Sequence, residues 1–254
     1  MLKYSLAFFT LLLLGCGGQE RQSETKSTNT AVLPKKDETP KYIWLKEDNA
    51  EEILLDYFQK NKERKFRIST KFGNIDIQLY DNTPLHTGNF LYLVKEKDYF
   101  DGTVFYRTKP EFIIQGGNSE NERIEERRFE IGTYSLKAEF NTDNYHKRGA
   151  VAMSRNYGNN PEKRSTPYDF YIVVGKPHSD YVLYTHQREK EFTFPKEHFK
   201  TYQTLGGTPH LDQEHTVFGE VVAGMDVVDK ISKLETDKSE WPKEDVVMDI
   251  HILK

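Results

Sequence analysis

Residues 105–118 read Phe-Tyr-Arg-Thr-Lys-Pro-Glu-Phe-Ile-Ile-Gln-Gly-Gly-Asn, and this stretch decides how the rest of the chain is interpreted. It places Arg107 next to aromatic residues on one predicted strand, followed by an apolar strand, a glutamine and a glycine pair. Taken alone, the pattern is more typical of a strand arginine that forms a salt bridge than of a functional one. The surrounding sequence has to separate a structural arginine from a functional one.

Short strands are predicted on both sides of this stretch. Apolar residues alternate over 66–72 and again over 75–79, and the break at Gly73-Asn74 indicates a hairpin. Further strands are expected at 104–106, 112–115, 150–153, 170–174, 217–222 and 246–253. About eight short strands, joined mostly by loops, favour an antiparallel barrel or sandwich over a parallel sheet.

Few helices are predicted. Thr83-Pro84 opens one whose inward residues include Phe90 and Leu93, and a later helix carries Met225 and Val228 on one stripe. Residues 41–65 form a helical lead-in to the folded domain, with Asn49 as its cap. The polar segment 176–208 is expected to be an insertion with one helical stretch around 195–202.

The N-terminus is expected to direct export. Lys3 precedes an apolar run over 4–14, which is a secretory signal pattern and too short for a stable membrane span. Its end, Leu13-Leu14-Gly15-Cys16, resembles the lipobox of bacterial lipoproteins, in which the signal is cut before a cysteine that then receives lipid. An ordinary signal peptide with an incidental cysteine is the alternative. The lipobox interpretation predicts a signal peptide at 1–15, lipidation of Cys16 and a flexible tether over 16–40.

The composition excludes several classes of function. Of the 254 residues, 36% are hydrophobic and 30% are charged, with a net charge of −4. Positive residues form no stripe, so we expect no nucleic-acid partner. The single cysteine rules out an internal disulfide. The eight histidines have no metal-ligand spacing, and the sequence carries no Gly-x-Ser-x-Gly motif or phosphate loop, so we expect no cofactor and no metal.

Residues 105–118 resemble the signature of the cyclophilin-type peptidyl-prolyl isomerases, which reads Phe-His-Arg-Val-Ile and then Phe-Met-Ile-Gln-Gly-Gly-Asp. Over roughly 66–254, other segments resemble that family in the same order: Phe72-Gly-Asn-Ile-Asp-Ile-Gln-Leu-Tyr with Asn89-Phe90, Arg148-Gly-Ala-Val-Ala-Met-Ser-Arg, Tyr168-Asp-Phe-Tyr-Ile-Val and Leu211-Asp-Gln-Glu-His-Thr-Val-Phe-Gly-Glu-Val. The resemblance implies a mainly β fold: a closed eight-stranded antiparallel barrel capped by two α-helices. The lead-in adds an N-terminal helical extension.

The resemblance also implies a site. Arg107 corresponds to the arginine that stabilises the twisted amide, and Gln115 to a glutamine that bonds both this arginine and substrate backbone. Ser154 and Arg155 occupy positions whose backbone groups bind the peptide as an added strand. By position, the proline pocket and its rim are formed by Phe112, Ile113, Tyr171, Leu211, Phe218 and His215.

Three positions depart from the family pattern. Tyr106 replaces a histidine, and His210 stands where some members carry a tryptophan that contributes to cyclosporin binding. Asp169 replaces a pocket glutamine, and a carboxylate there could hold the Arg107 guanidinium rigidly or draw it away from substrate. The sequence leaves both outcomes open.

The resemblance predicts a monomeric isomerase that acts on proline-containing clients in the bacterial cell envelope. A lipid on Cys16 would anchor it to a membrane, facing the periplasm or the exterior. The alternative is a membrane-tethered proline-peptide binding module or chaperone with little isomerase activity. The 176–208 insertion is expected to alter access to one end of the groove.

Overall fold

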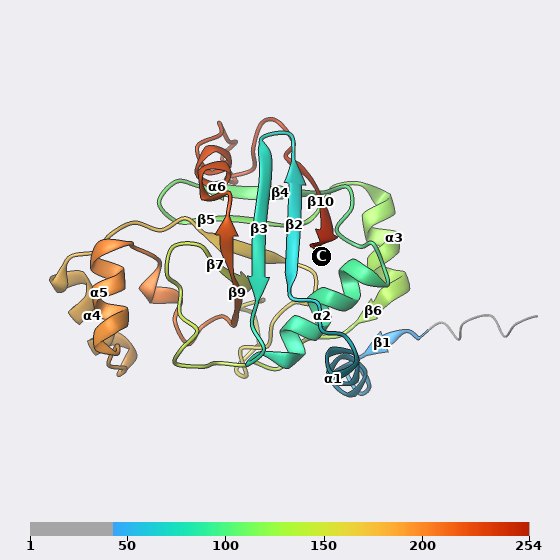
Figure 1. Cartoon of the computed structure of the whole chain (residues 1–254), viewed down its shortest axis with the longest axis horizontal. Helices are drawn as coiled ribbons and strands as arrows, with labels where there is room; N and C mark the ends of the chain where they lie inside the picture. Colours follow the sequence, from blue (N-terminus) through green and yellow to red (C-terminus); the bar gives the residue numbers. More distant parts are fainter. Residues whose placement is uncertain (1–42, 254) are drawn as a thin grey trace, which may run out of the picture. The chain divides into compact units, whose positions relative to one another are not determined.

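A closed barrel of eight strands dominates the computed structural model, which describes residues 43–253 (Figure 1). The strands follow the order β10-β2-β3-β9-β7-β8-β5-β4, and neighbouring strands are antiparallel. Their bounds are β2 Lys65–Thr70, β3 Gly73–Leu79, β4 Thr103–Lys109, β5 Ile113–Asn118, β7 Ala150–Met153, β8 Phe170–Val173, β9 Val217–Ala223 and β10 Val247–Ile252. The predicted barrel is confirmed, although the first hairpin turns at Lys71-Phe72 rather than at Gly73-Asn74.

Two helices cap the barrel as expected: α2 (Pro84–Lys95) and α6 (Met225–Ser232) lie at opposite ends of it in Figure 1. The lead-in contains α1 (Ala50–Lys60). It also contains β1 (Leu45–Lys46), which pairs in parallel with β6 (Gly132–Thr133). The insertion forms α4 (Asp180–Lys190) and α5 (Lys196–Thr204), followed by the short 3₁₀-helix η1 (Pro209–Leu211).

Helices α3 (Glu122–Ile131) and α4 were not predicted. Helix α3 buries only Ile124 and Ile131, and α4 buries only Leu183. An amphipathic helix is recognised from the sequence by a continuous apolar stripe. One or two buried residues per helix do not make such a stripe.

Helix α2 is held in place at its first turn. Pro84 starts the helix, and the Glu139 carboxylate accepts the backbone N–H groups of Leu85 and His86, both at 2.9 Å. Farther along, a Cβ at Gly88 would collide with the Leu54 carbonyl oxygen, so glycine lets α1 pack directly on α2. Phe90 of α2 then enters the barrel, where its ring contacts those of Phe66, Phe100, Phe170 and Phe218.

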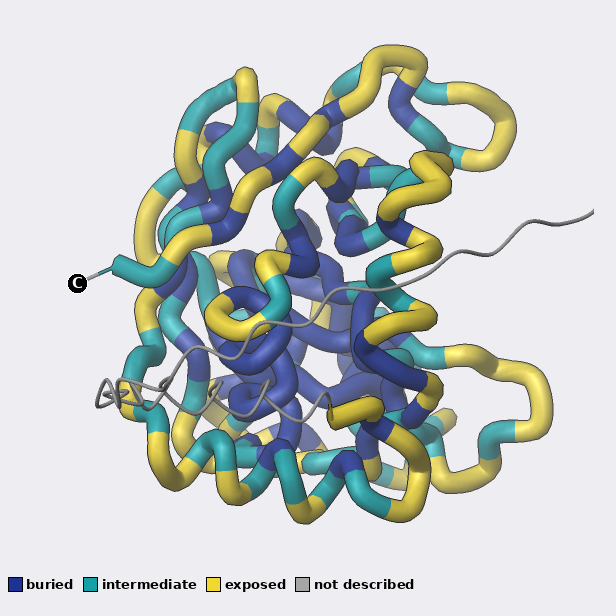
Figure 2. The backbone as a smooth tube through the Cα atoms, turned by 90° about the vertical axis from the view of Figure 1, so that its right-hand side faces the viewer, coloured by how far each residue is buried: buried dark blue, intermediate teal, exposed yellow. Residues whose placement is uncertain are grey.

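The barrel wall separates two apolar clusters, because side chains of a strand alternate between its faces. Ile114, Phe170 and Phe218 belong to the large cluster inside the barrel. Their sequence neighbours Ile113, Tyr171 and Val217 belong to a smaller cluster on the outer face. Figure 2 shows the buried backbone concentrated in the centre of the molecule. The outer cluster forms the floor of the site described below.

The N-terminal predictions, a signal peptide at 1–15, lipidated Cys16 and a tether over 16–40, lie outside the described residues. Within 43–253, no helix has the length and apolar character needed to cross a bilayer.

Candidate active site

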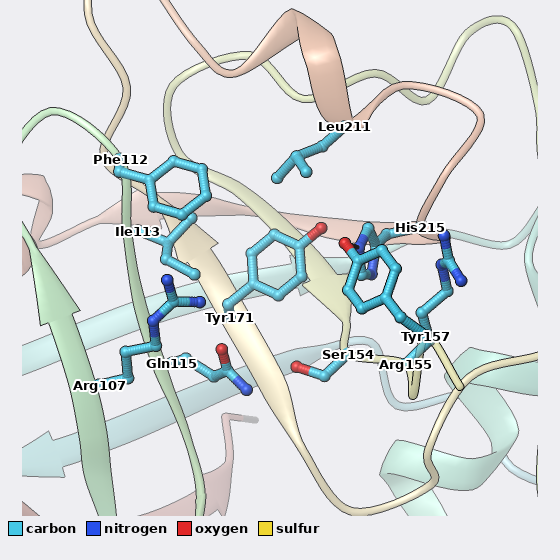
Figure 3. Close-up of a pocket in the computed structure, with 10 residues that line it drawn as sticks. All are labelled: Arg107, Phe112, Ile113, Gln115, Ser154, Arg155, Tyr157, Tyr171, Leu211 and His215. Carbon is cyan, nitrogen blue, oxygen red and sulfur yellow. Dashed lines mark hydrogen bonds between the residues drawn. The ribbon is translucent and has the colours of Figure 1, made fainter. Parts of the chain in front are cut away.

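A groove of about 200 Å³ opens on the outer face of the barrel wall, over β5, β7 and β8. Figure 3 shows its lining, which is an apolar floor with an arginine at each end. The lining residues are Arg107, Phe112, Ile113, Gln115, Ser154, Arg155, Tyr157, Tyr171, Leu211 and His215. Apart from Tyr157, each of these was predicted from the sequence.

The assignment of Phe218 to the pocket was wrong. Its side chain is fully buried inside the barrel, where its ring lies 5.7 Å from that of Phe90. The preceding residue, Val217, belongs instead to the outer cluster under the groove. Adjacent strand residues face opposite sides, so a strand that offers Val217 to the groove must turn Phe218 inward.

Tyr157 was missed by the sequence analysis. Its hydroxyl lies 2.7 Å from His215 Nε2, while His215 Nδ1 lies 3.2 Å from the Met153 carbonyl oxygen. A carbonyl can only accept, so Nδ1 carries the proton and Nε2 accepts from the tyrosine. Burial lowers the pKa of His215 to about 3, and the imidazole at the groove rim is therefore neutral at physiological pH.

Arg107 presents its guanidinium at one end of the groove. Its Nε donates to Glu240 Oε2 at 2.7 Å, and the guanidinium lies 5.6 Å from the centre of the Phe112 ring. Neither Nη atom hydrogen-bonds to any residue in the described part of the chain. In Figure 3 one of these nitrogens points toward Tyr171 and the other toward Ile113 and Phe112. A cation with unused donors thus sits beside an apolar surface.

The other groove arginine has no such freedom. Arg155 donates through Nε to the Glu214 carbonyl at 2.7 Å and through Nη2 to the Glu214 carboxylate at 2.8 Å. Its guanidinium also stacks 4.1 Å over the Tyr157 ring. Arg155 therefore supports the rim, and Arg107 is the arginine that can bond to a ligand.

Asp169 does not touch Arg107, which answers the question left open by the sequence. Its carboxylate binds Arg128 of α3 at 3.0 Å and accepts from the Tyr106 hydroxyl at 3.3 Å. That hydroxyl in turn accepts from Gln115 Nε2 at 2.5 Å. Burial raises the pKa of Asp169 even though Arg128 opposes the shift. The amide nitrogen of Gln115 is thus occupied, and its oxygen faces the groove beside Arg107 (Figure 3).

The groove floor rests on a buried hydrogen-bond chain. The Tyr171 hydroxyl lies 2.9 Å from His146 Nε2, and His146 Nδ1 lies 2.8 Å from Asp212 Oδ1. The other Asp212 oxygen accepts from the Tyr202 hydroxyl of α5 at 2.6 Å. Each member has its partner, so the chain fixes the position of the Tyr171 ring.

The two positions expected to bind peptide backbone differ. Ser154 donates its N–H to the Asp169 carbonyl and accepts from Thr166 N–H, both at 2.8 Å. Its backbone is therefore already used, and the prediction for Ser154 backbone binding is wrong. The Arg155 backbone N–H and C=O make no hydrogen bond to a described residue. The Ser154 hydroxyl, although buried, has no partner within 43–253 and lines the groove.

His210 is exposed and is not among the residues that line the groove. Its ring stacks on Phe112 at 5.6 Å and contacts His186 of α4 at 5.9 Å. From the same helix, Lys190 Nζ donates to the Asp212 carbonyl at 3.0 Å. The insertion therefore supports the wall that carries Leu211 and His215.

This arrangement suits a particular kind of ligand. The floor accommodates a compact apolar ring, and Arg107 offers hydrogen-bond donors and positive charge at one edge of it. These interactions need no nucleophile, although the Tyr157 and Tyr171 hydroxyls each lie beside a histidine ring nitrogen, at 2.7 and 2.9 Å. The groove can thus bind and polarise a ligand without covalent chemistry.

Comparison with known proteins agrees with this geometry. Residues 65–251 match the family model described as cyclophilin type peptidyl-prolyl cis-trans isomerase/CLD. A peptidyl-prolyl cis-trans isomerase of Acinetobacter baylyi is 31% identical over 170 residues, covering 66% of this chain and 72% of the relative. A Streptococcus pyogenes protein named for phosphatase and peptidyl-prolyl cis-trans isomerase activities is 35% identical over 188 residues, or 73% of this chain. The chain spans only 37% of that longer relative.

A solved structure shares the fold. The cyclophilin type peptidyl-prolyl cis-trans isomerase of Cryptosporidium parvum superposes with a TM-score of 0.53 at 20% sequence identity. The match covers 76% of this chain and 99% of that one.

Proposed function

The chain belongs to the cyclophilin-type peptidyl-prolyl cis-trans isomerases, and from this premise we propose that it uses Arg107 to isomerise Xaa-Pro bonds in exported or envelope proteins. The observation that carries the proposal is the Arg107 guanidinium, which is anchored through Nε while both Nη atoms face the apolar floor. We expect proline-containing polypeptides as clients and no cofactor.

The reaction requires rotation about a single amide bond. Its barrier is about 18–20 kcal/mol because resonance must be broken, and no proton transfer is needed. In the twisted state the proline nitrogen becomes pyramidal and regains a lone pair. A donor that reaches this nitrogen only in the twisted state lowers the barrier, because it stabilises the transition state more than either planar form.

Arg107 supplies part of the required stabilisation. A hydrogen bond from a charged donor contributes about 1.5–3 kcal/mol. An acceleration of about 10⁵-fold needs about 7 kcal/mol. The remainder has to come from the dry floor around Tyr171, where electrostatic interactions are stronger than in water, and from anchoring of the flanking peptide.

Gln115 and Arg155 are placed to anchor the substrate backbone. The Gln115 oxygen faces the groove because its amide nitrogen is bonded to Tyr106. The backbone of Arg155 has a donor and an acceptor without protein partners in the described chain. If the peptide is held on both sides of the proline, the segment can still rotate about the Xaa-Pro bond.

The cellular setting rests on the sequence. The signal-like residues 1–15 and Cys16 support a protein that is lipid-anchored in the bacterial cell envelope, with the tether 16–40 between membrane and barrel. Labelling cells with a radioactive or clickable fatty acid would test this, because Cys16→Ser should abolish incorporation into the protein.

A protease-coupled assay with a proline peptide tests the enzymatic proposal. We expect the intact protein to accelerate isomerisation well above background. Arg107→Ala should lower kcat/KM about 100-fold, since the lost contribution is about 1.5–3 kcal/mol. No acceleration by the wild-type protein would overturn the proposal, and measurable peptide binding without acceleration would favour the binding-module alternative.

The insertion is proposed to shape one end of the groove. Helix α4 contacts the groove wall at two points. Its Lys190 donates to the Asp212 carbonyl, and its His186 ring contacts that of His210. Lys190→Ala should therefore change selectivity among peptides that differ next to the proline. Identical selectivity of the variant and the wild type would contradict this role.

A further inference from the structure

Glu240 lies 133 residues from Arg107 in the chain, yet their side chains form an ion pair. We propose that Glu240 is a positioning residue, which holds the Arg107 guanidinium so that both Nη atoms face the groove. This inference rests on the proposed role of Arg107. The inference adds the loop between α6 and β10 to the site. No residue of this loop lines the groove.

The contact uses the one guanidinium nitrogen that the proposed reaction does not need. Glu240 Oε2 lies 2.7 Å from Arg107 Nε. Fixing Nε restricts rotation of the planar group about the end of its side chain. Both Nη atoms then keep a defined direction and remain available as donors. In a bidentate pair, by contrast, the carboxylate would occupy at least one of them.

A second cation limits how far Glu240 neutralises Arg107. Its other oxygen, Oε1, accepts from Lys109 Nζ at 2.5 Å. One carboxylate is thus shared between two positive groups on β4, and the cluster of three keeps a net charge of +1. Positive charge therefore remains at the groove edge, where a developing lone pair would need it.

The loop that carries Glu240 is closed by its own hydrogen bonds. Asp237 Oδ1 accepts from the backbone N–H of Ser239 at 2.7 Å and of Trp241 at 3.0 Å, while Asp237 N–H donates to the Trp241 carbonyl at 2.8 Å. Glu240 itself has a φ of 66°, in the left-handed region that costs energy for a non-glycine residue. The loop retains this conformation at the residue that meets Arg107.

The same loop is docked on the strand that carries Arg107. The Glu240 carbonyl accepts from Thr108 N–H at 2.9 Å, and the Trp241 ring lies 5.7 Å from that of Tyr106 at an angle of 35°. The loop therefore contacts both sequence neighbours of Arg107, namely Tyr106 and Thr108. These contacts fix the Glu240 carboxylate relative to β4 and so account for a defined Arg107 geometry.

The test compares Glu240→Ala and Glu240→Gln with the control Glu244→Gln. Glu244 is a neighbouring acid that pairs with Lys71 instead of the groove arginine. Glu240→Ala should lower kcat/KM about tenfold through kcat, while the affinity for a slowly turned-over proline peptide changes less than about twofold. Glu240→Gln retains an oxygen that can accept from Nε and should recover most of the activity; Glu244→Gln should equal the wild type.

A double-mutant cycle separates positioning from a general structural effect. In the Arg107→Ala background, Glu240→Ala should cause no further loss, because the residue it positions is already gone. An equal loss in both backgrounds would overturn the proposal.

An NMR measurement gives a readout that does not depend on activity. The Arg107 Nε–H signal should be protected from solvent exchange in the wild type and unprotected in Glu240→Ala. An unprotected signal in the wild type would overturn the positioning role. If the wild-type protein shows no isomerase activity, the proposed function fails, and the NMR signal still decides whether Glu240 holds Arg107.

Discussion

Two arginine–carboxylate pairs flank Tyr106, and they differ in side-chain exposure and in how many hydrogen bonds each guanidinium makes. On one side, Arg107 pairs with Glu240, and their side chains are 38% and 27% exposed. On the other side, Arg128 pairs with Asp169, and these are 26% and 14% exposed. The Tyr106 hydroxyl donates to Asp169 of the second pair, and its ring faces Trp241, which follows Glu240 of the first pair in the sequence.

The donors of the two arginines show what each pair does. Arg128 donates to the Tyr99 hydroxyl at 2.6 Å, to the Gly117 carbonyl at 3.0 Å and to Asp169 at 3.0 Å. Its guanidinium also lies 5.1 Å from the Tyr168 ring centre. Arg107 makes one side-chain hydrogen bond among the described residues. The same pair of residue types therefore stabilises the fold at one place and leaves donors for a ligand at the other.

The largest test of this difference removes the cation from the structural pair. Arg128→Leu should destabilise the protein by about 3 kcal/mol, because it leaves the largely buried Asp169 carboxylate without its cation and with only the Tyr106 hydroxyl as a side-chain partner. Urea unfolding measures the change. Arg123→Leu, on the exposed side of the same helix, should cost less than about 0.5 kcal/mol. A similar small loss for Arg128→Leu would mean that the two pairs do not differ as described.

The next test acts on the residue between the pairs. Tyr106→Phe removes the hydroxyl that joins Gln115 to Asp169 but keeps the ring against Trp241. Since one hydrogen bond is worth about 0.5–1.5 kcal/mol, kcat/KM should fall about fivefold as the Gln115 amide loses its orientation. Tyr57→Phe, a hydroxyl bonded to Glu96 away from the groove, is the matched control and should leave kcat/KM unchanged.

The smallest effect should appear in the pH dependence of stability, where the two carboxylates shift in opposite directions. Burial raises the pKa of Asp169 from the ordinary 3.8, so its contribution to stability is full below that pH and is lost as the pH rises through its folded-state pKa. Hydrogen bonds from Lys109 and then Arg107, acting against burial, lower the pKa of Glu240 from 4.5. Its contribution is present above 4.5 and is lost as the pH falls through its folded-state pKa.

Unfolding free energies over about pH 3–7 check these signs. Relative to Asp169→Asn, the wild type should lose stability as the pH rises. Relative to Glu240→Gln, it should lose stability as the pH falls. Two curves with slopes of the same sign would show that the environments of Asp169 and Glu240 are more alike than their exposures indicate.

Much of the fold follows from local sequence. Strand alternation predicts the barrel because one face of each strand must enter a dry interior, and Pro84 marks the start of α2. The same alternation could have corrected the assignment of Phe218, since Val217 and Phe218 cannot both face the groove. The alternation of side chains between the two faces of a strand thus predicts which residues line a pocket better than their position in a motif does.

The parts that the sequence did not predict depend on distant partners. Glu240 lies in a polar loop whose sequence shows no sign that it meets Arg107. Arg128 and Asp169 are brought together by α3, a helix with too few apolar residues to be recognised from its pattern. Tyr157 reaches His215 from an exposed loop. Ion pairs and hydrogen bonds between residues tens of positions apart leave no periodic signal in the sequence, so only the folded structure reveals them.

The hydrogen-bond chain from Tyr171 to Tyr202 has a consequence for protein engineering. The floor tyrosine, His146, Asp212 and the hydroxyl from α5 satisfy one another in series. Removing any one leaves a buried neighbour unpaired, at about 1–3 kcal/mol each. Anyone who transplants this groove into another barrel, or trims the excursion that carries Tyr202, must therefore exchange all four together.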